Sequence, residues 1–211
     1  EPGTRNGYHM VNFGWTVGEL VRRVSGKSLG TFFAEEVAGP TGARFWIGLP
    51  DSEKPHIAPI LTYVHKAEIG GAGGLSNARG QVAMYTPLAC NDGSLVSPDR
   101  LANMGMVSTA TQRDATLLVP TRFASGFMKS MDNRAYPAGD QMTAIMGNDA
   151  FGHVGAGGSI GFADPECGLA FSYTMNQMGA GLLVNDRGQS LIDAAYKALG
   201  YRTNAPGAWV Q

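Results

Sequence analysis

"FGHVGAGGSIGFADPECGLAFSYTMNQMG", residues 151–179, predicts two antiparallel strands joined by a tight turn. The turn is ADPECG, where Pro165 suits the second position of a β-turn and Gly168 follows it. The later stretch RGQSLIDAAYKALG has the spacing of an amphipathic helix. The apolar face predicted for that helix consists of Leu191, Ile192, Ala195 and Leu199. We therefore expect a sheet with one face covered by a C-terminal helix.

Helical patterns dominate the chain before this sheet. In residues 11–26 the apolar residues recur at helical spacing and fall on one face. The members of that face are Val17, Leu20, Val21 and Val24. Ser28 suits the N-cap of a second helix that ends before Pro40, and Ser97 suits the N-cap of a short third helix.

The order of helices, strands and a final helix predicts an α+β fold: a helical cluster followed by an antiparallel sheet with a covering C-terminal helix. We expect residues 1–115 to form a helical region and residues 116–211 to form the C-terminal part of the sheet domain. Hydrophobic residues make up 44% of the 211 residues and charged residues 16%, which indicates a globular chain.

Charge and composition exclude several classes of function. The formal net charge of -1 gives no electrostatic reason to expect binding to nucleic acid or to an acidic membrane surface. No apolar run is long enough to span a bilayer. Two cysteines far apart in sequence form neither a disulfide framework nor a metal-ligand pattern, and we expect no metal or cofactor.

The first residues, Glu1-Pro2-Gly3-Thr4, lack an initiator methionine and a signal-like segment. This abrupt start leads us to expect that the chain is a piece of a longer protein. Any targeting segment would then lie upstream, so the sequence predicts no localisation.

Residues 157–161 spell G-x-S-x-G, the pattern of a nucleophile elbow around Ser159. An elbow serine lies on a strand-to-helix turn, whereas Ser159 is followed by a strand, a turn and a second strand. In an α/β-hydrolase the catalytic histidine follows the serine, yet all four histidines here precede Ser159. The pattern therefore favours a packing or strand role for Ser159.

Other interpretations of this glycine-rich run are also weak. It does not fit G-x-G-x-x-G and no helix follows it, which argues against a dinucleotide site. A metal site on His153 has no companion at ligand spacing. The structural alternative is a strand against which another backbone or a ligand packs closely.

Two long stretches, residues 2–43 and 151–179, resemble the serine β-lactamase-like hydrolases. This family includes class C β-lactamases, penicillin-binding-protein relatives and carboxylesterases, and the chain is most similar to the esterase-like branch. The stretches GLSNARGQVAMY and LVSPDRL between them also resemble the family, in the same order. The likeness implies a β-lactamase/transpeptidase-like fold that is incomplete here, and an esterase acting through an acyl-enzyme.

The resemblance carries two of the three family motifs onto this chain. The Y-x-N motif matches Tyr8-His9-Met10, which implies Tyr8 as the catalytic proton shuttle. Met10 departs from the asparagine and leans away from β-lactam substrates. The K-T-G or H-x-G motif matches His153-Val154-Gly155, and the following N–H, on Ala156, is implied as an oxyanion donor.

The resemblance leaves several roles open. Gly155, Gly157 and Gly158 would let backbone N–H groups approach the oxyanion. His153 would hydrogen-bond the substrate or the tyrosine, or only hold the strand edge. His9 would supply order beside Tyr8 or simply face solvent.

The first family motif, S-x-x-K, which supplies the nucleophile and a lysine, does not occur in these 211 residues. We therefore expect this chain to be inactive alone, with apolar surface that a missing N-terminal segment or another copy covers. The expected substrate is a small-molecule ester or amide. The alternative is a non-catalytic binding or interaction module that keeps the fold.

Overall fold

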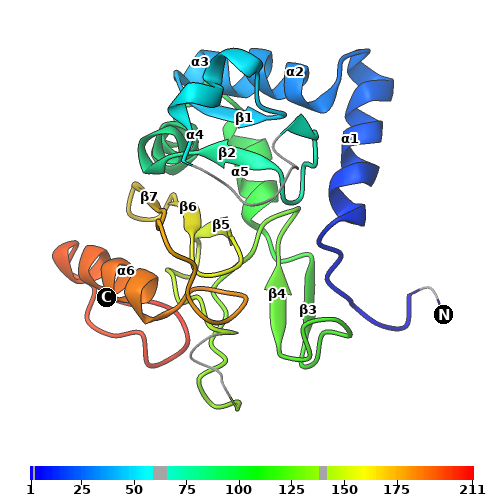
Figure 1. The fold of residues 1–211 in the computed structure, drawn as a ribbon. Helices are drawn as coiled ribbons and strands as arrows, with labels where there is room; N and C mark the ends of the chain where they lie inside the picture. The colour runs from blue at the N-terminus through cyan, green and yellow to red at the C-terminus, as the bar shows by residue number, and fades with distance from the viewer. Residues whose placement is uncertain (2, 59–65, 138–141) are drawn as a thin grey trace. The chain divides into compact units, whose positions relative to one another are not determined.

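The computed structural model describes residues 1, 3–58, 66–137 and 142–211. These residues form two compact units (Figure 1). The first unit comprises Glu1–Tyr8 and Tyr85–Gln211, and the second comprises His9–Met84. These units are defined by contacts within the structure. The boundary that the sequence predicts between residues 115 and 116 is a different division and stays a prediction.

The predicted hairpin is confirmed in the first unit. Strands β6 (Ile160–Asp164) and β7 (Leu169–Tyr173) pair antiparallel, with Asp164 opposite Leu169 beside the turn. Gly168 lies in that turn at φ +67°, a left-handed conformation that glycine adopts without steric cost. Strand β5 (Phe151–Val154) pairs antiparallel with the other edge of β6.

Two further strands extend this sheet. Strands β3 (Thr109–Thr111) and β4 (Thr121–Phe123) form an antiparallel pair. Met128 makes isolated β-bridges to both Phe123 and Gly152, so it joins β4 to β5. The sheet therefore places the end of β4 close to β5.

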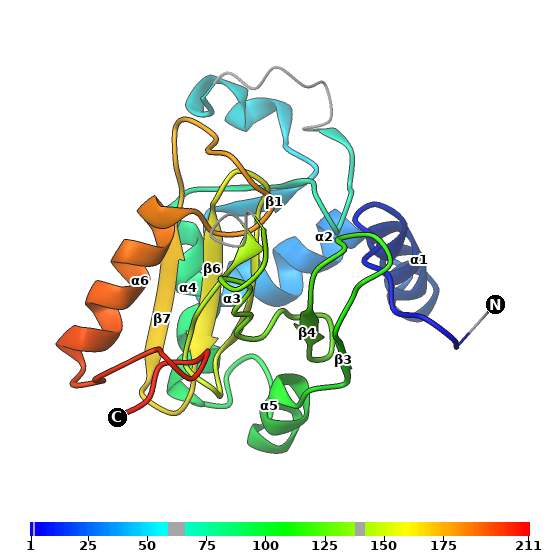
Figure 2. The same cartoon turned by 90° about the horizontal axis from the view of Figure 1, so that it is seen from below.

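The C-terminal helix α6 (Asp186–Ala198) covers one face of β5–β7, as the sequence predicted. Figure 2 shows it lying along β7. Its buried residues are Gly188, Ile192 and Tyr196. The predicted face was partly wrong, because Leu191 and Leu199 are each 47% exposed. The Tyr196 ring stacks parallel to Phe162 of β6, at 6.3 Å between centroids, and this contact sets the rotation of the helix.

The second unit contains short helices and one small strand pair. Its elements are α1 (Asn12–Ser25), α2 (Leu29–Phe33), the π-helical turn η1 (Ala34–Ala38), α3 (Gly39–Thr41), β1 (Phe45–Ile47), the 3₁₀ helix η2 (Asp51–His56) and β2 (Gly74–Ser76). Helix α4 (Ala78–Cys90) begins in this unit and ends in the first, and α5 (Pro98–Gly105) belongs to the first. No helix in the described ranges has the length and apolar character needed to cross a membrane.

The helix caps agree with the sequence, but the effect of proline does not. The Ser28 and Ser97 hydroxyls accept hydrogen bonds from the N–H groups of Thr31 and Arg100, as N-caps do. The expectation that the helix after Ser28 ends before Pro40 was wrong. The π-helical turn brings the Gly39 N–H onto the Ala34 carbonyl, and α3 then continues through Pro40.

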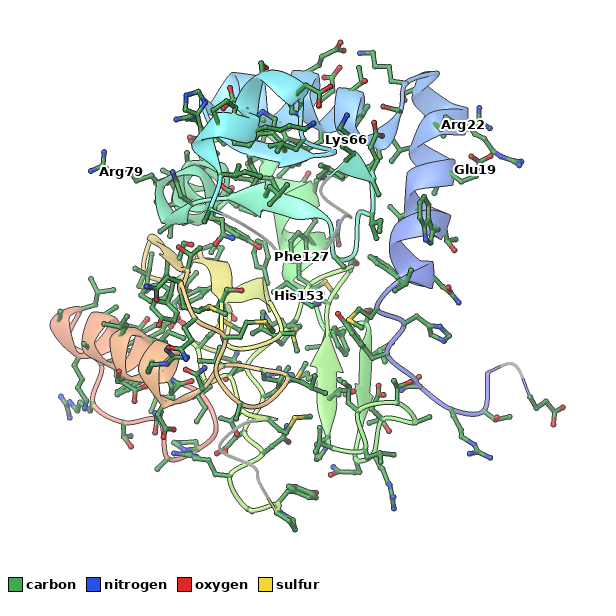
Figure 3. All side chains as sticks on the ribbon, in the orientation of Figure 1. Glu19, Arg22, Lys66, Arg79, Phe127 and His153 are labelled. Atoms are coloured by element: carbon green, nitrogen blue, oxygen red, sulfur yellow. The ribbon has the colours of Figure 1, made fainter. Side chains whose placement is uncertain are left out.

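In the described part of the chain, most of the predicted apolar face of α1 is exposed, and Val21 is half-buried. Val17, Leu20 and Val24 are 37%, 60% and 81% exposed, and Gly14 is the buried residue of the helix. Glu19 and Arg22, which project from α1 in Figure 3, form an exposed ion pair.

Candidate active site

The structure brings Tyr8 and His153 together across 145 residues of sequence, within the first unit. The Tyr8 Oη lies 3.4 Å from the His153 Nε2, and the two rings stack with centroids 5.9 Å apart. On its other side the Tyr8 ring stacks on Phe123, at the end of β4, also at 5.9 Å. The tyrosine ring therefore lies between β4 and β5, as the arrangement of the sheet requires.

The second nitrogen of His153 determines which partner donates in this contact. His153 Nδ1 lies 2.7 Å from the Val154 carbonyl oxygen, so Nδ1 carries the proton and Nε2 is left as the acceptor. The Tyr8 hydroxyl then donates to Nε2. At 3.4 Å this hydrogen bond is long.

Burial keeps both side chains neutral. It raises the pKa of the Tyr8 phenol above its ordinary value and lowers the pKa of the His153 imidazole, against the smaller opposing effect of the Val154 carbonyl. Among the described residues no cation counteracts the effect on Tyr8. Tyr8 is therefore a hydrogen-bond donor in this chain, and it would need a nearby positive charge to become a base.

Residues 155–158 form the turn between β5 and β6, and most of their N–H groups are already used. Gly155 donates to Ser159 O at 2.7 Å, and Gly157 donates to Gly181 O at 3.3 Å. Within the described part of the chain, the N–H of Ala156 has no partner, and Ala156 is exposed. Of the three predicted oxyanion residues, Ala156 alone presents a free amide.

The glycines here serve the turn. Gly157 has φ +86°, and a Cβ on it would approach Met178 to 2.8 Å. Gly158 has φ +114°, and a Cβ there would collide with the Asn185 amide. Ser159 directly precedes β6, and its side chain fills the space beside Gly155. This is the packing position that the sequence favoured for Ser159.

The remaining predicted residues belong to the second unit. His9 and Met10 are both exposed. A supporting role for His9 stays a prediction. No cluster of three or more His, Cys, Asp or Glu side chains suited to a metal ion occurs in the described ranges.

Sequence reasoning missed two residues that contact Tyr8. Phe123 stacks on its ring, and the buried carboxylate of Asp114 accepts a hydrogen bond from its backbone N–H at 3.0 Å. Phe123 is the last residue of β4. Asp114 lies in a polar loop without periodicity, so no local signal marked it.

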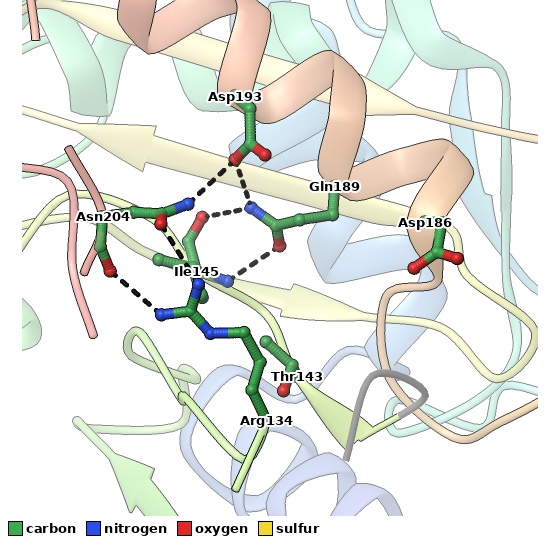
Figure 4. A pocket seen from close by; sticks show the side chains of 7 residues that line it. All are labelled: Arg134, Thr143, Ile145, Asp186, Gln189, Asp193 and Asn204. Carbon is green, nitrogen blue, oxygen red and sulfur yellow. Dashed lines mark hydrogen bonds between the residues drawn. The ribbon is translucent and has the colours of Figure 1, made fainter. Parts of the chain in front are cut away.

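A polar cavity of about 150 Å³ lies between α6 and the loops beside it (Figure 4). Its side chains largely satisfy one another. Gln189 exchanges two hydrogen bonds of 2.9 Å with the backbone of Ile145, and Asp193 accepts from Gln189 and Asn204. The cavity shares no residue with the Tyr8–His153 site. We interpret these hydrogen bonds as structural: they attach α6 to the backbone of Ile145.

Comparison with known proteins identifies the family of this chain. The family model described as Beta-lactamase matches residues 1–196. The chain belongs to the beta-lactamase family. Among curated family relatives, Esterase/beta-lactamase LipL of Mycobacterium tuberculosis is 28% identical over 231 aligned positions, covering 86% of this chain and 51% of LipL.

Solved structures show the same fold. A family VIII carboxylesterase superposes with a TM-score of 0.81 at 38% identity, over 93% of this chain and 59% of that protein. A penicillin-binding protein homologue from Caulobacter crescentus superposes with a TM-score of 0.77 at 30% identity, over 93% and 59%. The chain thus has the β-lactamase-like esterase fold and spans between half and three fifths of these relatives.

Proposed function

We propose that this chain supplies the tyrosine and oxyanion half of a serine esterase, whose nucleophile and lysine lie outside these 211 residues. The observation that carries the proposal is the 3.4 Å contact between Tyr8 Oη and His153 Nε2 on the strand that leads to the free N–H of Ala156. A proton shuttle that contacts the strand leading to the oxyanion donor suits acyl transfer.

The proposed chemistry proceeds in two halves. The external serine hydroxyl attacks the ester carbonyl and gives its proton to the Tyr8 phenolate, while the Ala156 N–H stabilises the oxyanion. The C–O bond then breaks, and the leaving alcohol takes the proton from Tyr8. In the second half, water replaces the serine as nucleophile by the same proton transfers, and the carboxylic acid and the free serine are released.

The protonation state of Tyr8 supports inactivity of the chain by itself. Burial raises the pKa of the phenol, so Tyr8 holds its proton at neutral pH. A lysine ammonium brought close by the missing motif would favour the phenolate. The chain alone therefore lacks both the nucleophile and the charge that activates its base.

Small-molecule esters or amides are the proposed substrates, with esters favoured. The two proteins reported above that are named as esterases support this choice. Met10 occupies the position where a β-lactamase would present an amide to its substrate, which leans away from lactams.

The exposed apolar face of α1 supports a covering partner. Val17, Leu20 and Val24 are all exposed on this helix. An upstream segment or another copy of the chain would bury them. If the upstream segment covers this face, the same segment would also carry the missing nucleophile.

A non-catalytic binding module is the second candidate, because the sequence has no S-x-x-K and Tyr8 is held as a neutral phenol. The sequence encoded upstream of Glu1 distinguishes the two. An S-x-x-K there supports the esterase, and its absence supports the module.

The proposed function is tested with p-nitrophenyl acetate and a fluorophosphonate probe. We expect no burst and no label on this chain, and labelling of the S-x-x-K serine in the protein that contains the upstream segment. A stoichiometric burst with label on Ser159, abolished by Ser159→Ala, would overturn the assignment. In the longer protein Tyr8→Phe should lower kcat about 10²–10⁴-fold.

A further inference from the structure

The backbone around Tyr8 has no regular secondary structure of its own to hold it, because residues 3–11 are neither helix nor strand. An aromatic side chain in such a segment keeps one position only if another part of the fold fixes the backbone. The fixing contact comes from the loop that joins β3 to β4. There the Asp114 Oδ1 accepts a hydrogen bond of 3.0 Å from the Tyr8 N–H, across 106 residues.

Asp114 is held firmly by its own loop. It is 1% exposed, and the same Oδ1 accepts from the N–H groups of Thr116 at 2.8 Å and Leu117 at 2.9 Å. The Thr121 hydroxyl lies 3.4 Å from its other oxygen. A buried carboxylate needs such donors to offset its desolvation. Since two of these donors belong to the loop and the third, Thr121, begins β4, Tyr8 is the partner that joins a preformed site.

A second contact reinforces the first. The Ala115 N–H donates to the Asn6 carbonyl at 2.8 Å, so residues 6 and 8 are both attached to residues 114 and 115. The ring of Tyr8 stacks on Phe123, which ends the same β3–β4 pair. One hairpin therefore fixes both the backbone and the ring of the tyrosine.

We infer that Asp114 is a positioning residue, which holds the Tyr8 phenol against His153; its relevance to catalysis rests on the proposed function. The Tyr8 Oη to His153 Nε2 distance of 3.4 Å is near the limit of a hydrogen bond. A backbone displacement of a few tenths of an ångström is enough to lose it. The carboxylate of Asp114 thus acts on the site through Tyr8, without touching the reacting atoms.

The test uses the 211-residue chain and no substrate. In ¹⁵N-labelled protein, the His153 ring nitrogens are followed by long-range ¹H–¹⁵N NMR. We expect Asp114→Ala to move the Nε2 resonance to that of an imidazole nitrogen without a hydrogen bond. Asp114→Asn, whose amide oxygen can still accept from the Tyr8 N–H, should restore the wild-type resonance.

A matched control separates positioning from general loss of stability. Asp164 is equally buried in the same unit, but its carboxylate accepts from Tyr196 Oη and the Glu166 N–H. Asp164→Asn should lower the melting temperature and leave the His153 Nε2 resonance in place. The inference is overturned if folded Asp114→Ala keeps the wild-type resonance, or if Asp164→Asn moves it equally.

If Asp114→Ala does not fold, an amide-to-ester replacement at Tyr8 removes only the N–H that Asp114 accepts. The same shift of the Nε2 resonance is expected, and an unchanged resonance overturns the inference. In the longer protein, Asp114→Ala should lower kcat by up to about 10²-fold, with Asp114→Asn restoring most of it. Because the NMR test involves no turnover, its outcome is independent of whether the esterase proposal survives.

Discussion

Helix α6 buries Ile192 and Tyr196 completely, whereas helix α1, in the other unit, buries only Gly14. Both helices have an apolar face at helical spacing. In α6 that face packs on the sheet and on the aromatic rings around it. In α1 the corresponding face carries Leu20 at 60% and Val24 at 81% exposure.

The difference shows that an amphipathic pattern predicts a helix but not its partner. A covered face requires a surface of matching shape within the chain, and α6 finds one in β6 and β7. Helix α1 is held by close backbone approach instead: its Gly14 lies against the backbone of Gly70 and Gly71 in the same unit. Changes on the apolar face should therefore cost much more stability in α6 than in α1.

The largest expected effect comes from truncating the face of α6. Ile192→Ala should lower the free energy of unfolding by about 2–5 kcal/mol, because Ile192 is fully buried in the core against the sheet. The matched change Leu20→Ala on α1 should cost less than about 0.5 kcal/mol, since Leu20 is exposed. Urea unfolding of both variants measures the difference.

Equal losses in the two variants would contradict the comparison. They would mean that Leu20 is covered in solution, by the chain itself or by another copy. Repeating the unfolding at two protein concentrations separates these cases, because only cover by another copy depends on concentration.

The second expected effect tests how α1 is attached. Gly14→Ala should lower the free energy of unfolding by about 1–3 kcal/mol, because its Cβ would collide with the backbone nitrogen of Gly71. At Gly18, four residues on in the same helix, a Cβ would meet only the Leu29 side chain, with Cδ2 at 3.4 Å and Cβ at 3.8 Å. Gly18→Ala should therefore be neutral or stabilise by up to about 1 kcal/mol.

Thermal unfolding measures both glycine variants. A stabilising Gly14→Ala would show that the close backbone approach is not what holds α1. The comparison with α6 would then lose its physical basis, since neither the apolar face of α1 nor Gly14 would hold α1 in place.

Local chemistry explains the parts of the fold that the sequence predicted. The ADPECG turn and the caps at Ser28 and Ser97 depend on neighbouring residues only, and all three were predicted correctly. The face of α6 was predicted only in part, because the helical repeat allows two overlapping faces. The aromatic contact of Tyr196 with Phe162 selects one of them, and that contact depends on the sheet.

The candidate site divides in the same way. The resemblance to a family named Tyr8, His153 and Ala156, and the structure brings the tyrosine and the histidine within 3.4 Å. The roles of these residues stay predictions. Asp114 could not be found from the sequence, because its link to Tyr8 spans 106 residues and its loop carries no periodic pattern. A longer-range signal than composition or spacing is needed for such residues.

A third prediction compares how the stability of the two units responds to acid. Burial holds the pKa of His153 below its ordinary value of 6.5. The unfolded chain therefore binds the proton first, and stability is lost as pH falls below about 6.5, by at most about 1.4 kcal/mol per pH unit. On α1, hydrogen bonds from Arg22 and then Arg23 lower the pKa of Glu19 to about 2. The contribution of ionised Glu19 to stability is fully present above pH 4.5 and is lost only as the pH falls towards 2.

Urea unfolding between pH 7.5 and 5 should thus show a decline in wild type that is reduced in His153→Gln. Amide hydrogen exchange should place the decline in β5 and leave α1 unchanged over this range. A decline of the same size in His153→Gln would assign the acid response to another group.

The smallest expected effect on folding, and the most direct test of what the face of α1 does, comes from adding a charge to it. Leu20→Lys should change the free energy of unfolding by less than about 0.5 kcal/mol, because the side chain is exposed. The same charge should weaken any self-association that buries the apolar face, since an ammonium resists desolvation. Asn12→Lys, at an exposed position of α1 that lies off that face, adds the same charge as a control. Sedimentation velocity should show association in wild type and Asn12→Lys and less in Leu20→Lys; a wild-type chain that is monomeric at all concentrations would mean that an upstream segment, and not another copy, covers the face.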